Sequence, residues 1–198
     1  MSEENGTGVH RDELARHMAL TLDINRFRDY CPNGLQVEGR EQIRTVVSGV
    51  TASLALLEAA VDAQADMVLV HHGYFWRGED PRVIGPRQRR LKLLLTHDIN
   101  LFAYHLPLDA HPELGNNAQL ARQLGFVPDG RFGEQDLGWL GSTSAGTVAE
   151  LALLVERALG RQPIVIGDPS QAVGRVAWCT GAAQGSLDAA IASGATAY

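Results

Sequence analysis

The 198-residue chain has few of the features that mark secreted or nucleic-acid-binding proteins. Its two cysteines, Cys31 and Cys179, are too few for a disulfide framework, and the absence of a C-x-x-C pair excludes the common thiolate zinc sites. Asp and Glu outnumber Lys and Arg by 23 to 17. Proteins that bind nucleic acid or anionic membranes without specificity usually carry the opposite excess. We therefore expect reduced thiols and do not expect nucleic acid as a partner.

Long apolar runs are also missing. No segment approaches the roughly 18 uninterrupted apolar residues that a membrane-spanning helix needs. The first residues, MSEENGTGVHRDE, are polar and acidic and lack the apolar core of a signal peptide. We expect a cytoplasmic protein with no membrane partner. Because 45% of the residues are apolar, the chain can build one large domain or two small ones.

Alternating helical and strand-like patterns predict the α/β fold class, with mixed, largely parallel sheets. The segment DYCPNGLQVEG, residues 29–39, is rich in turn formers and is predicted to be a loop. Short apolar runs such as 67–70 are typical of strands that are covered on both faces. We expect helices at 10–22, 53–65, 87–96 and 117–124, and strands at 45–50, 67–70 and 99–105.

A glycine- and proline-rich stretch with little periodicity, residues 128–146, indicates a domain boundary. We place the first α/β domain at 1–127 and the second at 128–198. Thr147 and Glu150 have the spacing of a capping box, which predicts a helix that ends at Gly160. Strands are expected at 163–166 and 175–180, and a helix at 186–192.

The second domain repeats part of the first. VVSGVTASLALLEAAVDAQADMVLVHHG and AWCTGAAQGSLDAAIASGATAY both follow the order strand, glycine, turn, helix, strand. If the similarity is structural, the final ATAY begins a strand equivalent to the one that carries His71 and His72, and the chain stops inside it. We therefore expect this chain to be a fragment whose second domain is truncated.

Polar side chains with metal-binding chemistry follow two neighbouring predicted strands. His71 and His72 end one apolar run, and His105 ends the next, with Asp109 four residues later. Successive strand residues point to opposite faces, so the pair can share a site only where Gly73 lets the chain turn. The carboxyl ends of parallel strands meet at one edge, where open α/β sheets bind ligands.

The donor types define which ions this edge would hold. Imidazole with carboxylate suits Zn, Mn, Fe, Ni or Co better than Ca or Mg. Several donors exceed the needs of one catalytic ion, and a carboxylate such as Asp109 can bridge two ions. The sequence therefore predicts a metal site at this edge, formed by His71, His72, His105 and Asp109. Hydrogen-bonded core histidines are the competing interpretation.

Other polar clusters have simpler explanations. We expect His10, His17, His97 and His111 to be ordinary hydrogen-bonded or surface residues. The only cationic cluster, Arg87, Arg89, Arg90 and Lys92, fits a solvated helix face, with phosphate recognition as the alternative. A glycine-bearing turn at residues 181–186 could present backbone amides to an anion, but helix capping by Ser186 explains it more simply.

Three motifs together resemble a known family. CPNGLQVEG, VLVHHGYFWRGEDPRV and DINLFAYHLPLDAHPELGNNAQLARQLG are similar to the NIF-three-like dinuclear metal-centre family, also called the type 2 GTP cyclohydrolase I family, in its bacterial short form. WCTGAAQGSLDAAI resembles the second domain of that family. The resemblance implies two α/β domains, a site with two divalent transition-metal ions, and a toroidal homohexamer.

The resemblance also implies residue roles. His71, His72 and Asp109 coincide with metal ligands, and His105 falls beside the centre, where it could act catalytically as a proton shuttle. The family supplies a further His and Glu from a GHHATE-like segment that this sequence lacks, in agreement with the expected truncation.

Two functions follow from this resemblance. The first is a metal-dependent hydrolase acting on a nucleotide or related heterocycle, such as C8 of a guanine nucleotide. The alternative is a non-catalytic, metal-stabilised ring that serves as a scaffold, regulator or nucleic-acid-binding protein.

Overall fold

The computed structural model describes residues 8–198 and divides into two compact units, Met1–Pro107 and Leu108–Tyr198. The boundary predicted from the sequence, after residue 127, lies further along the chain than this division after Pro107. The glycines and prolines of residues 128–146 indicated a domain boundary, but in the structure residues 127–142 form a hairpin inside the second unit. Helix α5 (Asn116–Leu124), which precedes them, contributes to the core of that same unit.

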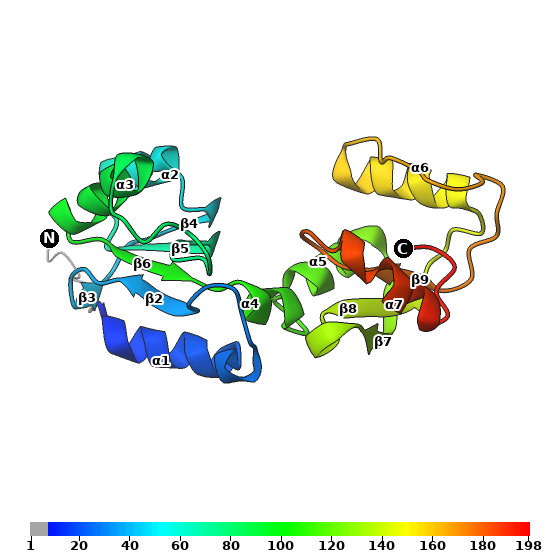
Figure 1. Ribbon diagram of the computed structural model, residues 1–198, viewed down its shortest axis with the longest axis horizontal. Coiled ribbons are helices and arrows are strands. Elements are labelled where there is room, and N and C mark those ends of the chain that lie inside the picture. Colours follow the sequence, from blue (N-terminus) through cyan, green and yellow to red (C-terminus); the bar gives the residue numbers. More distant parts are fainter. Residues whose placement is uncertain (1–7) are drawn as a thin grey trace, which may run out of the picture. The chain divides into compact units, whose positions relative to one another are not determined.

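The first unit is built on a four-stranded mixed sheet with the order β2-β6-β5-β4. Strands β4, β5 and β6 are parallel, and β2 pairs antiparallel with β6. In Figure 1 helices α2 and α3 cover one face of the sheet and α1 lies on the other. The strands are β2 Gly34–Val37, β4 Val46–Thr51, β5 Met67–His72 and β6 Asn100–Ala103, with a small ladder of β1 Val9–His10 and β3 Gln42–Ile43; the helices are α1 Arg11–Thr21, η1 Ile24–Arg26, α2 Leu54–Asp62 and α3 Gly85–Thr96.

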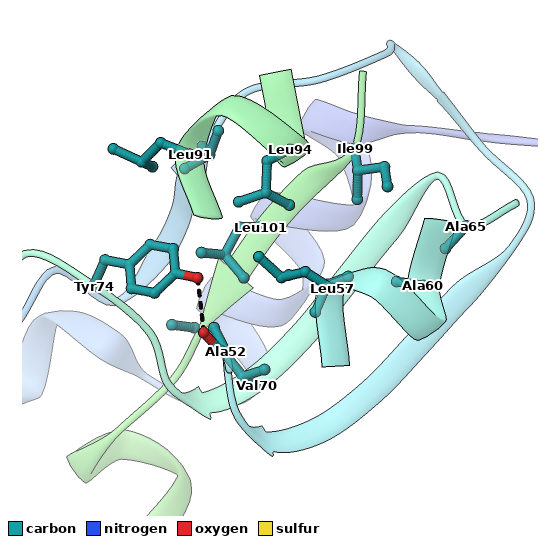
Figure 2. Packing of buried hydrophobic residues seen from close by; sticks show 13 residues of the cluster. Ala52, Leu57, Ala60, Ala65, Val70, Tyr74, Leu91, Leu94, Ile99 and Leu101 are labelled. Atoms are coloured by element: carbon teal, nitrogen blue, oxygen red, sulfur yellow. Dashed lines mark hydrogen bonds between the residues drawn. The ribbon is translucent and has the colours of Figure 1, made fainter. Parts of the chain in front are cut away.

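The core of this unit lies between the sheet and the pair α2 and α3. Leu57 from α2, Leu94 from α3 and Leu101 from β6 are fully buried together (Figure 2). The Tyr74 hydroxyl donates a 2.7 Å hydrogen bond to the Ala52 carbonyl at the border of this cluster, so the loop after β5 is attached to the loop after β4. Continuous apolar strands are expected where a sheet is covered on both faces.

Two sequence-based assignments change in this unit. The predicted loop at 29–39 contains strand β2, because Leu35 and Val37 pair with Phe102 and Leu101 of β6. This pairing depends on a strand that lies far along the chain, which local turn propensity does not detect. Strand β5 also continues through His72 instead of ending at Val70.

The second unit contains a three-stranded antiparallel sheet with the order β7-β8-β9. A short connection joins β7 and β8, as only antiparallel neighbours allow. The capping box of Thr147 and Glu150 is confirmed, and α6 ends at Gly160 in the left-handed conformation. The strands are β7 Val127–Phe132, β8 Gly138–Ser142 and β9 Val176–Trp178; the helices are α4 Leu106–Ala110, which begins before the division, α5, η2 Glu134–Asp136, α6 Val148–Leu159, η3 Gln184–Ser186 and α7 Leu187–Ala192.

Both faces of this sheet are covered. Trp139 and Trp178 pack with α5 and α6, whereas Leu140 and Ala177, their neighbours along the strands, pack with Ala190 of α7. The alternation of side chains along each strand produces this division. The mixed α/β class expected from the sequence is confirmed.

One further prediction was wrong in the second unit. Residues 163–166 are not a strand: they run along one wall of an apolar groove of about 490 Å³, with Ile164 89% and Ile166 96% exposed. Consecutive β-branched residues favour extended backbone, but in the structure residues 163–166 pair with no described strand.

Across residues 8–198, no helix is both long and apolar enough to cross a membrane.

Candidate metal centre

Three imidazoles gather at the carboxyl ends of β5 and β6. The ring centroids of His71 and His72 lie 4.5 Å apart, and His105 lies 5.0 Å from the first and 5.7 Å from the second. Each side chain offers one ring nitrogen to a group of atoms that all lie within 4.8 Å of one another. The structure thus brings together three of the four residues that the sequence singled out.

The adjacent histidines share this site although strand geometry separates neighbouring side chains. Strand β6 pairs with β5 only as far as Val70 and Ala103, so His71 and His72 extend beyond the end of β6. His72 still pairs with Thr51 of β4. From the sequence we expected the rings to share a site only where the chain turns. In the structure the two rings converge at the edge of the sheet although strand β5 continues through His72.

Gly73 is required by the close approach of a neighbouring strand. A Cβ at this position would lie 2.1 Å from Oε1 of Gln36 and 2.6 Å from Cβ of Ala103. Gln36 occupies that space because its amide oxygen accepts a 2.7 Å hydrogen bond from Tyr74 N and its Nε2 donates to Tyr74 O at 3.1 Å. Strand β2 therefore holds the loop that follows the histidine pair.

The hydrogen bond of His71 determines its tautomer. Its Nδ1 lies 2.9 Å from the carbonyl oxygen of Tyr104. A carbonyl can only accept, so Nδ1 carries the proton and the lone pair is on Nε2. Metal-binding histidines commonly have this arrangement, with the second ring nitrogen bonded to a carbonyl or carboxylate.

His105 is held in the same way by a carboxylate. Its Nδ1 lies 2.7 Å from Oδ1 of Asp29, and its backbone N–H donates to Oδ1 of Asn33 at 2.7 Å. Burial raises the pKa of Asp29, but hydrogen bonds from His105, Asn33 and the backbone of Leu106 and Tyr30 outweigh it and lower the pKa to about 2. The ionised carboxylate accepts, so the lone pair of His105 is also on Nε2.

His72 and an aromatic side chain complete this edge. Nδ1 of His72 lies 3.3 Å from Oγ1 of Thr51. The indole of Trp76 packs edge-on against His105, with centroids 4.9 Å apart, and lies 5.9 Å from the ring of His72. Its Nε1 donates to Gly73 O at 3.2 Å. The indole therefore forms an apolar wall beside the imidazoles.

The donor set fits a borderline transition-metal ion. Two of the three imidazoles are in the tautomer that leaves Nε2 as the donor atom, and neutral imidazole suits Zn, Fe, Ni or Co. A second group of potential ligands, Asp29, Cys31 and His105, fits less well. Burial and the charge of Asp29 raise the pKa of the Cys31 thiol to about 12, so metal binding there would have to release the thiol proton.

Asp109 belongs to the second unit and is buried. Its Oδ1 accepts hydrogen bonds from Nδ2 of Asn116 at 2.7 Å and from Oγ1 of Thr180 at 3.2 Å. Nδ2 of Asn117 donates to its backbone oxygen at 3.4 Å. Side chains from α5 and from the segment after β9 therefore hold the carboxylate in place.

The remaining sequence candidates have local roles. Nδ1 of His111 accepts hydrogen bonds from two backbone amides, and His10 accepts one from Asp12 at the start of α1. The guanidinium of Arg87 pairs with Glu79 and binds the carbonyl of Asp80. These contacts tether the loop after β5 to α3 and give Arg87 a structural role.

Sequence reasoning missed the residues that orient the histidines. Asp29, Asn33 and Gln36 lie in the segment predicted to be a loop, and their partners are 38 to 77 residues further along the chain. The only signal was the density of polar residues in DYCPNGLQVEG. That density indicates a turn but not what the side chains bind.

The chain is similar to proteins from several bacteria. It is 60% identical over 181 residues to the "GTP cyclohydrolase 1 type 2 homolog" of Pseudomonas aeruginosa, covering 89% of this chain and 71% of that relative. The protein of the same name from Escherichia coli strain K12 is 53% identical over 187 residues, covering 94% of this chain and 75% of the relative.

Solved structures share the fold. The structure of protein ybgI, described as being of unknown function, matches with a TM-score of 0.89 and 49% identity over 94% of this chain and 76% of that one. TTHA1606 from Thermus thermophilus matches with a TM-score of 0.79 and 36% identity over 91% and 74% of the two chains. The model of the DUF34/NIF3 (NGG1p interacting factor 3) family matches residues 9–198, and the chain therefore belongs to that family.

Proposed function

We propose that this protein is a metal-dependent hydrolase that acts on a nucleotide or related heterocycle. The observation that carries the proposal is the convergence of two proposed ligands, His71 and His72, with a proposed proton acceptor, His105, whose ring nitrogens lie within 4.8 Å of one another at a sheet edge. The names of the relatives, which refer to GTP cyclohydrolase, support a guanine nucleotide as the first substrate to test.

In this proposal His71 and His72 are metal ligands and Asp109, four residues after His105, is the carboxylate ligand. Nitrogen and oxygen donors together favour divalent Zn, Fe, Mn, Ni or Co. A carboxylate can serve two ions, so we propose that His71, His72 and Asp109 would hold a dinuclear centre. We also propose a homohexamer as the functional assembly.

Divalent ions held by these residues would supply an activated water molecule, because such ions lower the pKa of bound water toward 7. His105 is the proton-transfer residue. Its Nδ1–H is bonded to Asp29, so its Nε2 would accept a proton from the water as the water oxygen bonds to the electrophilic carbon. The π electrons of the C=N bond at that carbon would move to the nitrogen, which takes up a proton. For a guanine nucleotide this carbon is C8 of the imidazole ring. Trp76 shields one side of His105 from solvent.

Metal analysis followed by GTP turnover tests the proposal. We expect purified or reconstituted protein to hold divalent metal and to convert GTP, and a chelator to abolish turnover. If no metal binds after reconstitution, the metal-dependent function is refuted. If metal binds and GTP is unchanged, the guanine nucleotide is refuted as substrate.

Single-residue variants separate the roles. We expect His72→Ala to lose metal and turnover, and His105→Ala to keep metal and lose turnover. His97→Ala, at the end of α3, is the matched control and should change neither. Light scattering on each variant reports assembly. Loss of assembly by His72→Ala, together with no turnover in any preparation, would instead support a metal-stabilised scaffold.

A further inference from the structure

Asp29 lies outside regular secondary structure, yet its side chain is only 3% exposed. Its carboxylate accepts four hydrogen bonds. Oδ1 accepts from Nδ1 of His105 at 2.7 Å and from Tyr30 N at 2.6 Å, and Oδ2 accepts from Leu106 N at 2.9 Å and from Nδ2 of Asn33 at 2.8 Å. An ionised carboxylate has about four lone-pair sites, so these donors use its full accepting capacity.

Asp29 and Asn33 hold both the ring and the backbone of His105. The carboxylate binds the ring at Nδ1, and Oδ1 of Asn33 binds the backbone N–H of the same residue at 2.7 Å. The Asn33 amide also donates to Asp29, so the two side chains support each other. His105 is therefore held at two points by a segment that lies much earlier in the chain.

The alternative orientation of the imidazole is unfavourable. Flipping the ring over would place a carbon opposite Oδ1 of Asp29 and leave a buried carboxylate without one of its donors. The perpendicular indole of Trp76, 4.9 Å away, also restricts the space for rotation. The packing thus selects one orientation of His105 and one tautomer.

We infer that Asp29 is a positioning residue that fixes His105 as the Nδ1–H tautomer and keeps the Nε2 lone pair available at the histidine cluster. The consequence for turnover rests on the proposed function, whereas the tautomer itself does not. Asp29 acts through His105 and does not contact the reacting atoms. A carboxylate that orients a proton-accepting imidazole serves the same purpose in other hydrolases.

The tautomer can be measured directly in metal-free protein. Long-range ¹H–¹⁵N correlation spectra of ¹⁵N-histidine-labelled protein at pH about 8.5 distinguish the two neutral tautomers, since that pH lies above the usual imidazole pKa of about 6.5. His105→Gln identifies the signals of His105. We expect the Nδ1–H tautomer in the wild type. The Nε2–H tautomer there would overturn the inference, whatever the variants do.

Asp29→Asn tests the role of the carboxylate. The amide NH₂ can donate to Nδ1, so we expect His105 to change to the Nε2–H tautomer. Asp62→Asn, an exposed residue at the end of α2, removes the same charge and should leave the tautomer unchanged. Backbone amide spectra report whether each variant folds. An unchanged tautomer in folded Asp29→Asn would overturn the inference.

Turnover provides the second readout. In protein that hydrolyses its substrate, we expect Asp29→Asn to lower kcat by about 100-fold, near the lower end for loss of a general base, with KM and metal content nearly unchanged. If wild-type protein shows the Nδ1–H tautomer but no hydrolysis, the proposed function fails and the positioning role stands. Equal kcat in wild type and Asp29→Asn would overturn the catalytic consequence of the inference.

Discussion

Gly73→Ala is expected to destabilise the loop that follows the histidine pair. The new methyl group would lie 2.1 Å from Oε1 of Gln36 and 2.6 Å from Cβ of Ala103. Gln36 has a flexible side chain and can move, but it then loses its two hydrogen bonds to Tyr74, at about 1 kcal/mol each. Ala103 belongs to β6 and cannot move away.

The overlap with Ala103 adds the cost of overpacking, about 1–3 kcal/mol. We therefore expect the free energy of unfolding to fall by about 3–5 kcal/mol, as measured by urea denaturation followed by circular dichroism. Gly185→Ala is the matched control, because its Cβ would meet no atom within 4 Å. The control should be neutral or slightly stabilising.

A double-mutant cycle tests the cause. In a Gln36→Ala background the hydrogen bonds to Tyr74 are already absent, so Gly73→Ala should cost about 1–3 kcal/mol, the overpacking alone. The coupling between the two substitutions should be about 2 kcal/mol. If Gly73→Ala costs no more than Gly185→Ala, or if the two substitutions are additive, the argument from close approach is refuted.

Three further predictions concern stability. Tyr74→Phe removes a hydroxyl that donates to a backbone carbonyl and should lower the free energy of unfolding by about 1 kcal/mol. Tyr104→Phe should be neutral or stabilising, because that buried hydroxyl has no hydrogen-bond partner among residues 8–198. Equal losses of stability for the two variants in urea denaturation would contradict this. Burial raises the pKa of Asp66, but hydrogen bonds from two backbone amides and the charge of Arg40 lower that pKa overall. The ionised carboxylate therefore stabilises the fold at pH values above its ordinary pKa of 3.8, and this contribution is lost as the pH falls through the lower pKa of the folded state. The difference in unfolding free energy between wild type and Asp66→Asn should therefore shrink below about pH 4, and a constant difference from pH 7 to 3 would be the contrary result. Thr147→Ala removes the first half of the capping box and should cost about 1 kcal/mol by the same assay, with no loss counting against a role for the cap.

Patterns within one element were predictable from the sequence. Helical and strand-like periodicity identified most of the helices and the central strands, and Thr147, Glu150 and Gly160 marked the ends of α6. The position of His71 and His72 at the end of an apolar run, with His105 at the end of the next, was enough to predict that the three imidazoles meet. Each of these signals depends on residues that are neighbours in the chain or on the shared polarity of parallel strands.

Pairings between distant segments were decided only by the tertiary structure. Strand β2 and the β7–β8 hairpin have turn-rich sequences and become strands because a partner strand is present, whereas residues 163–166 have a strand-like sequence but pair with no described strand. The contact of Asp29 with His105 joins residues 76 positions apart and determines a tautomer that no local pattern encodes. Hydrogen-bond partners of buried polar groups are chosen by the whole fold, because each must be satisfied by whatever group the packing brings near.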